Sequence, residues 1–186
     1  MSARVVLGIA GASGAALGLS VARQLAELDI QVDLVTSKAA ERTLMIECGA
    51  DAIEKLHKYV TRVHPLEDIG ASIASGSVPV AGMIVAPCSM RSLAAIASGL
   101  DDNLLTRAAS VQLKERRKLV LMTREAPLTL AHLRNMTWAT KMGAIILPPV
   151  PAFYLAPRSV DEIVEQIAAR AIDLLTIATP LAKKWT

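Results

Sequence analysis

Arginine and lysine stand at helix positions that should face a core. In the predicted helix 103–115, the stripe of positions 104, 107, 111 and 114 reads Leu, Arg, Val and Lys. In the predicted helix 159–177, the stripe of positions 163, 167, 170 and 174 reads Ile, Ile, Arg and Leu. Cations on an apolar stripe are rare unless they meet an anion. Arg107, Lys114 and Arg170 therefore indicate an anionic ligand, with snorkelling or an ion pair between subunits as the alternative.

A fourth cation, Arg124, stands beside Glu125 in the loop after the predicted strand 119–123. If these two residues meet the helix cations, they form a cationic pocket that contains one carboxylate. Such a pocket suits a phosphorylated substrate, because fixed cations bind phosphate oxygens strongly. Glu125 would then be a candidate general acid or base.

The loop after the predicted strand 4–9 is rich in small residues and leads into a helix. It reads Gly11-Ala12-Ser13-Gly14, which lets backbone N–H groups approach an anion at the helix N-terminus. The pattern is neither GxGxxG nor a P-loop, and Thr36-Ser37-Lys38 follows the second strand, where an NAD site has an acidic residue. A mononucleotide or flavin phosphate therefore fits better than NAD. The alternative is a tight turn whose small residues serve helix–sheet packing.

Ser89 and Ser92 stand at the start of the predicted helix 89–98, where plain N-capping and ligand contact explain them equally well. Cys88 precedes them, and a helix start can lower the pKa of a thiol. A buried, inert thiol is the preferred interpretation. Cys48 and Cys88 show no CxxC pattern and no nearby pair of histidines, so the sequence predicts neither a disulfide nor a metal site.

Apolar runs and helical periodicities alternate along the whole chain. Strands are predicted at 4–9, 30–36, 59–63, 82–86, 119–123 and 144–147. Helices are predicted at 15–28, 39–47, 51–58, 89–98, 103–115, 129–142 and 159–177, with capping boxes at Asp51 and Ser159 and helix ends at Gly99 and Gly143. This alternation predicts a single α/β domain over residues 1–186, a Rossmann-like three-layer sandwich with a mostly parallel sheet. Ligands then bind beyond the carboxyl ends of the strands.

The composition of the 186 residues argues against several classes of protein. Hydrophobic residues make up 53%, but aromatic residues only 3%, so the excess is aliphatic. The uncharged stretches 5–22 and 69–90 are long enough for membrane spans, but their glycines and prolines predict strand, loop and helix. Residues 1–4 lack a basic start, so no signal peptide is expected. The net charge of +3 does not indicate nucleic-acid binding, and we expect a cytoplasmic protein without a membrane or nucleic-acid partner.

Five blocks of the sequence closely resemble the UbiX-type flavin prenyltransferases: "GASGA", "TSKAAE", "GMIVAPCSMRSLAAIASG", "LKERRKLVLMTREAPL" and "KMGAIILPPVPAFY". This family includes the B subunits of phenolic and aromatic acid decarboxylases. The resemblance runs from Val5 to about Trp185. It implies metal-free transfer of a dimethylallyl group from dimethylallyl monophosphate to N5 and C6 of reduced FMN, which closes a fourth flavin ring. The prenylated FMN would then serve a UbiD-type decarboxylase.

The resemblance also implies roles for individual residues. FMN would be held by Gly11, Ala12, Ser13, Gly14, Ser37, Ser89, Met90, Arg91, Ser92 and Arg124. The dimethylallyl phosphate would be held by Arg107, Lys114, Glu125, Tyr154 and Arg170. Glu47 would handle protons near the flavin, and Trp185 would lie near the allyl group. The implied catalytic residues are Glu47, Glu125, Lys114, Tyr154 and Arg170, and no metal is implied.

Met90-Arg91-Ser92 stands where many relatives have Thr-Gly-Thr, and Ile69 stands where some have tryptophan. Two other functions are compatible with the same fold. One is that of FMN-dependent cysteine decarboxylases, whose PASANT-like and PxMNxxMW-like segments this sequence lacks. The other is that of a non-catalytic flavin-carrying subunit, which needs no second phosphate site. The family forms homo-oligomers, dodecamers among them, with sites between chains, so the aliphatic excess predicts a homo-oligomer.

Overall fold

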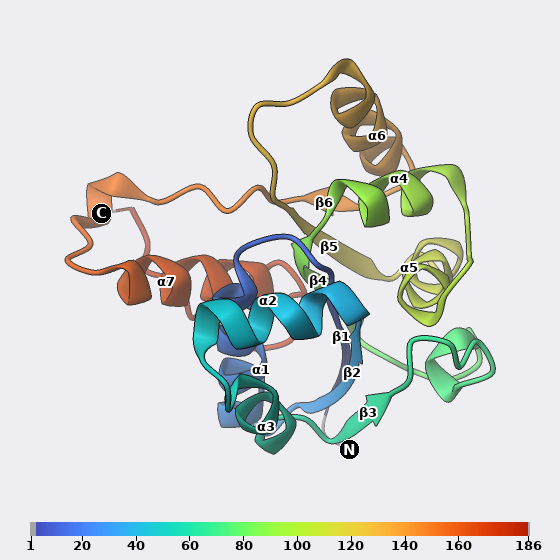
Figure 1. Cartoon of the computed structure of the whole chain (residues 1–186), viewed down its shortest axis with the longest axis horizontal. Coiled ribbons are helices and arrows are strands. Elements are labelled where there is room, and N and C mark those ends of the chain that lie inside the picture. Colours follow the sequence, from blue (N-terminus) through green and yellow to red (C-terminus); the bar gives the residue numbers. More distant parts are fainter. Residues whose placement is uncertain (1–2, 186) are drawn as a thin grey trace.

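The computed structural model describes residues 3–185, in which six parallel strands form one sheet (Figure 1). The strands are β1 (Arg4–Ile9), β2 (Gln31–Thr36), β3 (Arg62–His64), β4 (Gly82–Cys88), β5 (Lys118–Thr123) and β6 (Ile145–Ile146). Their order is β3-β2-β1-β4-β5-β6. This is the doubly wound order, in which the direction of winding reverses between β1 and β4. The predicted α/β, Rossmann-like fold is confirmed, whereas the extent of the domain over residues 1–186 stays a prediction.

Helices cover both faces of the sheet (Figure 1). One face carries α1 (Ala15–Glu27), α2 (Lys38–Cys48), α3 (Ala52–Lys58) and α7 (Val160–Asp173). The other face carries α4 (Met90–Ser98), α5 (Leu104–Lys114) and α6 (Leu130–Lys141), together with the 3₁₀ turn η1 (Ser72–Ala74). A second 3₁₀ turn, η2 (Phe153–Leu155), precedes α7. Successive strand residues point to opposite faces, so Val5 joins the first core and Val6 the second.

Hydroxyl and amide side chains mark most helix starts. Asp51 was expected to do the same, but its backbone is nearly helical (φ −93°, ψ 5°), and its carboxylate pairs with Lys55 at 2.9 Å instead of capping. Of the capping box predicted at Ser159, one hydrogen bond is present: the Ser159 hydroxyl accepts the N–H of Glu162. The Glu162 carboxylate accepts the N–H of Arg158 rather than that of Ser159. The side chains that do accept a capping hydrogen bond are Ser37, Ser89, Asn103, Thr129 and Ser159.

Most element boundaries agree with the sequence to within two residues. Gly99 and Gly143 follow helices with φ of 68° and 105°, as expected for left-handed helix ends. The last helix ends at Asp173 rather than at residue 177, because Thr176 adopts a left-handed conformation (φ 56°). The strand expected at 59–63 is β3 and begins later, at Arg62.

The two uncharged stretches resolve into separate elements. Residues 5–22 contain most of β1, the glycine loop and the first half of α1, and residues 69–90 contain η1, β4 and the first residue of α4. Within residues 3–185, no helix is both long and apolar enough to cross a bilayer. Met1 and Ser2, on which the signal-peptide argument partly depended, lie outside the described residues.

A buried polar network ties together the first three strands. Asp33 of β2 is 2% exposed and binds Arg4 of β1, whose Nη2 donates to Asp33 Oδ1 at 2.8 Å. Nε2 of His64, on β3, lies 2.7 Å from the same oxygen, and Arg4 also donates to the Ser72 hydroxyl. Burial by itself would raise the pKa of Asp33, but the hydrogen bonds from Arg4 and His64 outweigh it and hold the pKa below its ordinary value.

Candidate active site

The loops that follow β1, β4 and β5 meet at the carboxyl edge of the sheet. The N–H of Ala10 donates to the Pro87 carbonyl at 3.1 Å, and the N–H of Arg124 donates to the Cys88 carbonyl at 3.1 Å. The Arg124 guanidinium also reaches the first loop, where Nε donates to the Ser13 carbonyl at 3.0 Å. This edge includes the reversal point between β1 and β4, where doubly wound sheets bind ligands. The structure therefore brings together the predicted FMN residues of these three loops: 11–14, 89–92 and 124.

Glu47, near the end of α2, caps the start of α1. Its Oε2 accepts the backbone N–H groups of Gly14 and Ala15, both at 2.8 Å. Gly14 has φ of 105° and no side chain, so this helix start takes its cap from a different helix. The sequence suggested that such N–H groups would bind a phosphate. In this structure two of them bind the Glu47 carboxylate instead.

The surroundings of Glu47 favour its ionised form. Burial by itself would raise the pKa of this carboxyl group. Hydrogen bonds from Ser13, Ala15 and Gly14 outweigh that effect, and the positive charge of Arg124 adds to them. The pKa of Glu47 therefore lies below its ordinary value, and the group is ionised at neutral pH.

Two glycines of the first loop and helix are explained by packing. A methyl group at Gly11 would come within 2.3 Å of the Ala39 side chain, and one at Gly18 within 2.4 Å of the Ala86 carbonyl oxygen. The loop therefore passes close to α2, and α1 lies close against β4. At Gly11 the small residue serves packing of the loop against α2, and Gly18, beyond the loop, serves packing of α1 against the sheet.

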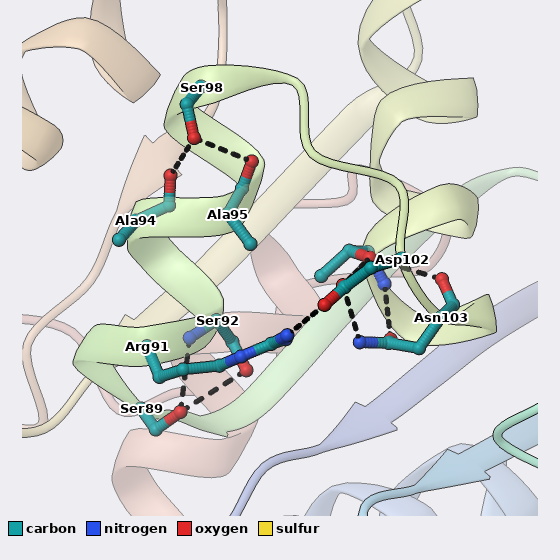
Figure 2. Close-up of polar contacts among 9 residues, drawn as sticks. Ser89, Arg91, Ser92, Ala94, Ala95, Ser98, Asp102 and Asn103 are labelled. Carbon is teal, nitrogen blue, oxygen red and sulfur yellow. Dashed lines mark hydrogen bonds and ion pairs between the residues drawn. The ribbon is translucent and has the colours of Figure 1, made fainter.

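Figure 2 shows how the start of α4 is organised. The Ser89 hydroxyl accepts the Ser92 N–H and donates to the Ser92 hydroxyl, both at 3.2 Å. The side chain of Arg91 extends away from this pair and forms an ion pair with Asp102, just before α5 (Figure 2). Met90 packs against the second core. Capping therefore accounts for the Ser89 hydroxyl, the Ser92 hydroxyl hydrogen-bonds to it, and the Arg91 guanidinium is paired with Asp102.

Two further residues of this edge have defined surroundings. Ser37 caps α2 by accepting the Ala40 N–H at 3.1 Å, and its own N–H donates to the carbonyl of Ile9 at the end of β1. Cys88 is fully buried, which raises the pKa of its thiol to about 12. The interpretation of Cys88 as an inert thiol is therefore confirmed.

A cavity of about 490 Å³ lies between α7, the loop after β6 and the C-terminal residues. Tyr154, Arg170 and Trp185 all line it, so the structure brings together three of the predicted substrate residues. The rings of Tyr154 and Trp185 meet edge to face, with centroids 4.7 Å apart and an angle of 74° between the planes. Arg170 is exposed. A cation and two aromatic rings thus share one cavity.

The expected cluster of buried cations is not assembled within one chain. Arg107 and Lys114 lie on α5 and Arg170 on α7, and these two helices cover opposite faces of the sheet (Figure 1). Lys114 is exposed and pairs with Glu115. Arg107 is half-buried and pairs with Asp101 at 3.0 Å. The prediction that these cations lie on buried stripes was wrong for Lys114 and Arg170, because long side chains at the margin of a stripe reach solvent.

Glu125 is also separate from this cavity. It is exposed beside Arg124 at the carboxyl edge, and its Oε1 accepts the N–H of Ala126 at 3.1 Å. The candidate acid or base therefore lies with the predicted FMN residues and not with Arg170 in one chain.

Sequence reasoning missed Asp101, Gln166 and Asp173. Asp101 is the anion that Arg107 meets, only six residues earlier in the chain. Gln166 and Asp173 flank Arg170 at helical spacing and line the same cavity. Their spacing on the helix can be read from the sequence, but their hydrogen bonds to residues 181–183 near the C-terminus cannot.

The sheet order and the loops that converge on its reversal point define the class of doubly wound α/β proteins that bind ligands at this edge. The family model described as Flavoprotein matches residues 1–172. The flavin prenyltransferase UbiX of Thauera aromatica is 49% identical over 183 residues, which cover 98% of this chain and 94% of that relative. The chain therefore belongs to the UbiX-type flavin prenyltransferases within the flavoprotein family.

Solved structures agree with this assignment. The crystal structure of AnUbiX (PadA1) in complex with FMN and dimethylallyl pyrophosphate matches with a TM-score of 0.95 at 42% identity, over 100% of this chain and 98% of that one. The dodecameric FMN-dependent UbiX-like decarboxylase from Escherichia coli O157:H7 matches with a TM-score of 0.93 at 41% identity, over 98% and 99%. The FMN-dependent cysteine decarboxylase TvaF, at 16% identity and a TM-score of 0.66, shares the fold alone.

Proposed function

We propose that this protein transfers a dimethylallyl group from dimethylallyl monophosphate to N5 and C6 of reduced FMN. Besides family membership, one observation carries this proposal: the chain has a cavity lined by Arg170, Tyr154 and Trp185, in addition to the loop cluster at the carboxyl edge. A flavin carrier needs only the loop cluster. A transferase also needs a place for its phosphorylated donor.

The carboxyl edge suits FMN through the chemistry of its donors. Hydroxyl groups stand at Ser37, Ser89 and Ser92, and a guanidinium stands at Arg124, all beside the reversal point of the sheet. The Ser37 and Ser92 hydroxyls and the Arg124 guanidinium can donate hydrogen bonds to phosphate and carbonyl oxygens, and the Ser89 hydroxyl, which donates to Ser92, holds that hydroxyl in place. Reduced FMN supplies the nucleophilic N5 and C6 atoms when it is bound. Glu47 lies beside this loop, where its carboxylate accepts the N–H groups of Gly14 and Ala15, and the proposal gives it a part in proton handling near the flavin.

The cavity beside α7 suits the donor. The Arg170 guanidinium can bind the phosphate with paired hydrogen bonds, and the Tyr154 hydroxyl can add another. When the C–O bond of the donor breaks, its electron pair leaves with the phosphate, so a fixed cation stabilises the transition state. The faces of Tyr154 and Trp185 can stabilise the positive charge that develops on the allyl carbons.

The complete site needs more than one copy of the chain. Arg107 and Lys114 lie on the opposite face of the sheet from Arg170, so they reach a donor phosphate bound by Arg170 only from a neighbouring subunit. An apolar face of α6 is exposed, with Leu130, Leu133 and Trp138 at 63%, 48% and 57% exposure, and it suits burial between subunits. The proposal therefore includes a homo-oligomer, a dodecamer as in the Escherichia coli relative.

The proposal also includes a protein that receives the product. Prenylated FMN is a cofactor and has to leave this protein to act elsewhere, so a UbiD-type decarboxylase of aromatic or unsaturated acids is the expected recipient. A cytoplasmic location is part of the same proposal.

Phosphate release tests the proposed function. The protein, reduced FMN and dimethylallyl monophosphate are incubated anaerobically without added metal, and inorganic phosphate is measured. Phosphate should appear only when all three are present. FMN binding without any phosphate release would favour the non-catalytic carrier. A parallel assay with dimethylallyl diphosphate, measured as pyrophosphate, gives the donor preference.

A further inference from the structure

The C-terminal residues 181–185, which we name the strap, lie along α7. Asp173, the last residue of that helix, binds the beginning of the strap with both carboxylate oxygens. Oδ1 accepts the N–H of Leu181 at 2.7 Å, and Oδ2 accepts the N–H of Ala182 at 3.1 Å. The chain after α7 thus turns back along this helix toward its N-terminal end (Figure 1).

Gln166 binds the middle of the strap through both of its amide atoms. Its Oε1 accepts the N–H of Lys183 at 3.1 Å, and its Nε2 donates to the carbonyl of Lys183 at 3.2 Å. The amide therefore pairs with one residue of the strap in both directions. Four hydrogen bonds from two side chains hold three consecutive strap residues.

These anchors lie on either side of Arg170. Gln166, Arg170 and Asp173 stand at positions i, i+4 and i+7, which share one face of a helix. The strap runs antiparallel to α7, because its first residues bind Asp173 and its middle binds Gln166. All three helix residues line the cavity of about 490 Å³. The strap therefore forms a wall of the cavity into which Arg170 faces.

The pairing of Gln166 with Lys183 also separates two cavities. Both residues line the cavity that contains Arg170, and both line a second cavity of about 460 Å³ between α1 and α7. The strap therefore lies at the boundary between these two spaces.

The position of Asp173 is unusual for an acidic residue. The C-terminus of a helix carries partial negative charge, so a carboxylate at the last position of α7 is unfavourable unless it has partners. The two strap N–H groups are such partners. Trp185 follows Lys183, the residue that Gln166 binds, by two positions, and its ring contacts the ring of Tyr154. Binding of the strap explains the carboxylate at this site.

We infer that Gln166 and Asp173 are positioning residues that hold the strap over the donor cavity. They keep Trp185 against Tyr154 and close the cavity around the dimethylallyl phosphate. This inference rests on the proposed function. It concerns binding of the donor and not of FMN, whose predicted residues line neither this cavity nor the strap.

The test compares Asp173→Ala and Gln166→Ala with Asp161→Ala, which removes an exposed carboxylate from the first turn of the same helix. Asp173→Ala and Gln166→Ala each remove two hydrogen bonds to the strap, and each should raise the KM for dimethylallyl monophosphate about tenfold or more. The KM for FMN and the thermal midpoint should stay close to those of the wild type. Asp173→Asn keeps one acceptor oxygen and should fall between Asp173→Ala and the wild type.

Amide hydrogen exchange of the C-terminal peptide gives a second readout that does not depend on turnover. The amides of residues 181–183 should exchange slowly in the wild type and in Asp161→Ala, and faster in both strap variants. Faster exchange with an unchanged KM for the donor, in a wild type that is active, would overturn the inference and leave the proposed function intact. A wild type that transfers no prenyl group would overturn the proposed function, and the inference with it.

Discussion

The Glu47 carboxylate accepts the backbone N–H of Gly14 at 2.8 Å, so a side chain of α2 caps the helix that follows β1. The two residues are 33 positions apart in the sequence. Their contact places an ionised carboxylate beside the loop that carries Ser13 and within the field of Arg124. One residue thus stabilises a helix start and places a negative charge at the carboxyl edge of the sheet.

Glu47→Gln should lower the free energy of unfolding at pH 7 by about 0.5 to 1 kcal/mol, a small value because the carboxylate is exposed. The folded pKa of Glu47 is depressed, so its contribution is present above the unfolded pKa of about 4.3 and is lost as pH falls through the folded pKa. The difference from wild type should therefore vanish in acid. Urea titrations at equal protein concentration measure it. The matched control is Glu54→Gln, which removes an exposed carboxylate from α3.

Asp33→Asn should be more costly, about 3 kcal/mol, because it leaves Arg4 without its buried partner. The pKa of Asp33 is also depressed in the folded protein, so its stabilisation is complete above the unfolded pKa of about 3.9 and disappears as pH falls through the folded pKa. Denaturation of both proteins at several pH values checks this. Equal stability at pH 7 would show that the network contributes nothing. The matched control is Asp68→Asn, an exposed aspartate before η1.

Arg170→Ala should leave FMN binding within about twofold of wild type and reduce prenyl transfer by at least about a hundredfold, because the donor phosphate loses its fixed cation. FMN affinity by fluorescence quenching and initial rates of transfer measure the two effects separately. Arg158→Ala removes an exposed arginine just before α7 and should be active. Normal turnover of Arg170→Ala would remove Arg170 from the site.

Mixed oligomers test whether Lys114 reaches the site from a neighbouring subunit. Lys114→Ala and Arg170→Ala should each be nearly inactive as pure proteins. If one site takes these residues from two chains, random co-assembly of equal amounts should restore about a quarter of the wild-type activity per site. Separate mixing without subunit exchange is the control. No recovery in verified mixed oligomers would place both residues in one chain.

The fold could be predicted from the sequence because it depends on local patterns. The apolar run of β4 and the hydroxyls at Ser37 and Ser89 mark elements within a few residues of where they occur. The left-handed turn at Gly99 also depends on local chain conformation. Asp51 failed as a cap because its backbone conformation, which the sequence does not reveal, keeps the side chain away from the helix start.

The site could be predicted only in part, because its remaining contacts are long-range. The helices that carry Lys114 and Arg170 were predicted correctly, but the exposure of these two side chains was not. The cap of Gly14 by Glu47 and the strap beside α7 each join segments that no local pattern connects. Contacts between copies of the chain are even harder to predict from local patterns, since they depend on the surface of another molecule.

The mass of the flavin tests the central claim most directly. Purified protein is incubated anaerobically with reduced FMN and dimethylallyl monophosphate, without added metal, and the flavin is analysed by mass spectrometry. The account predicts a flavin that is one prenyl unit heavier than FMN, formed only when the donor is present. An unchanged flavin mass, with FMN shown to be bound to the protein, would contradict it.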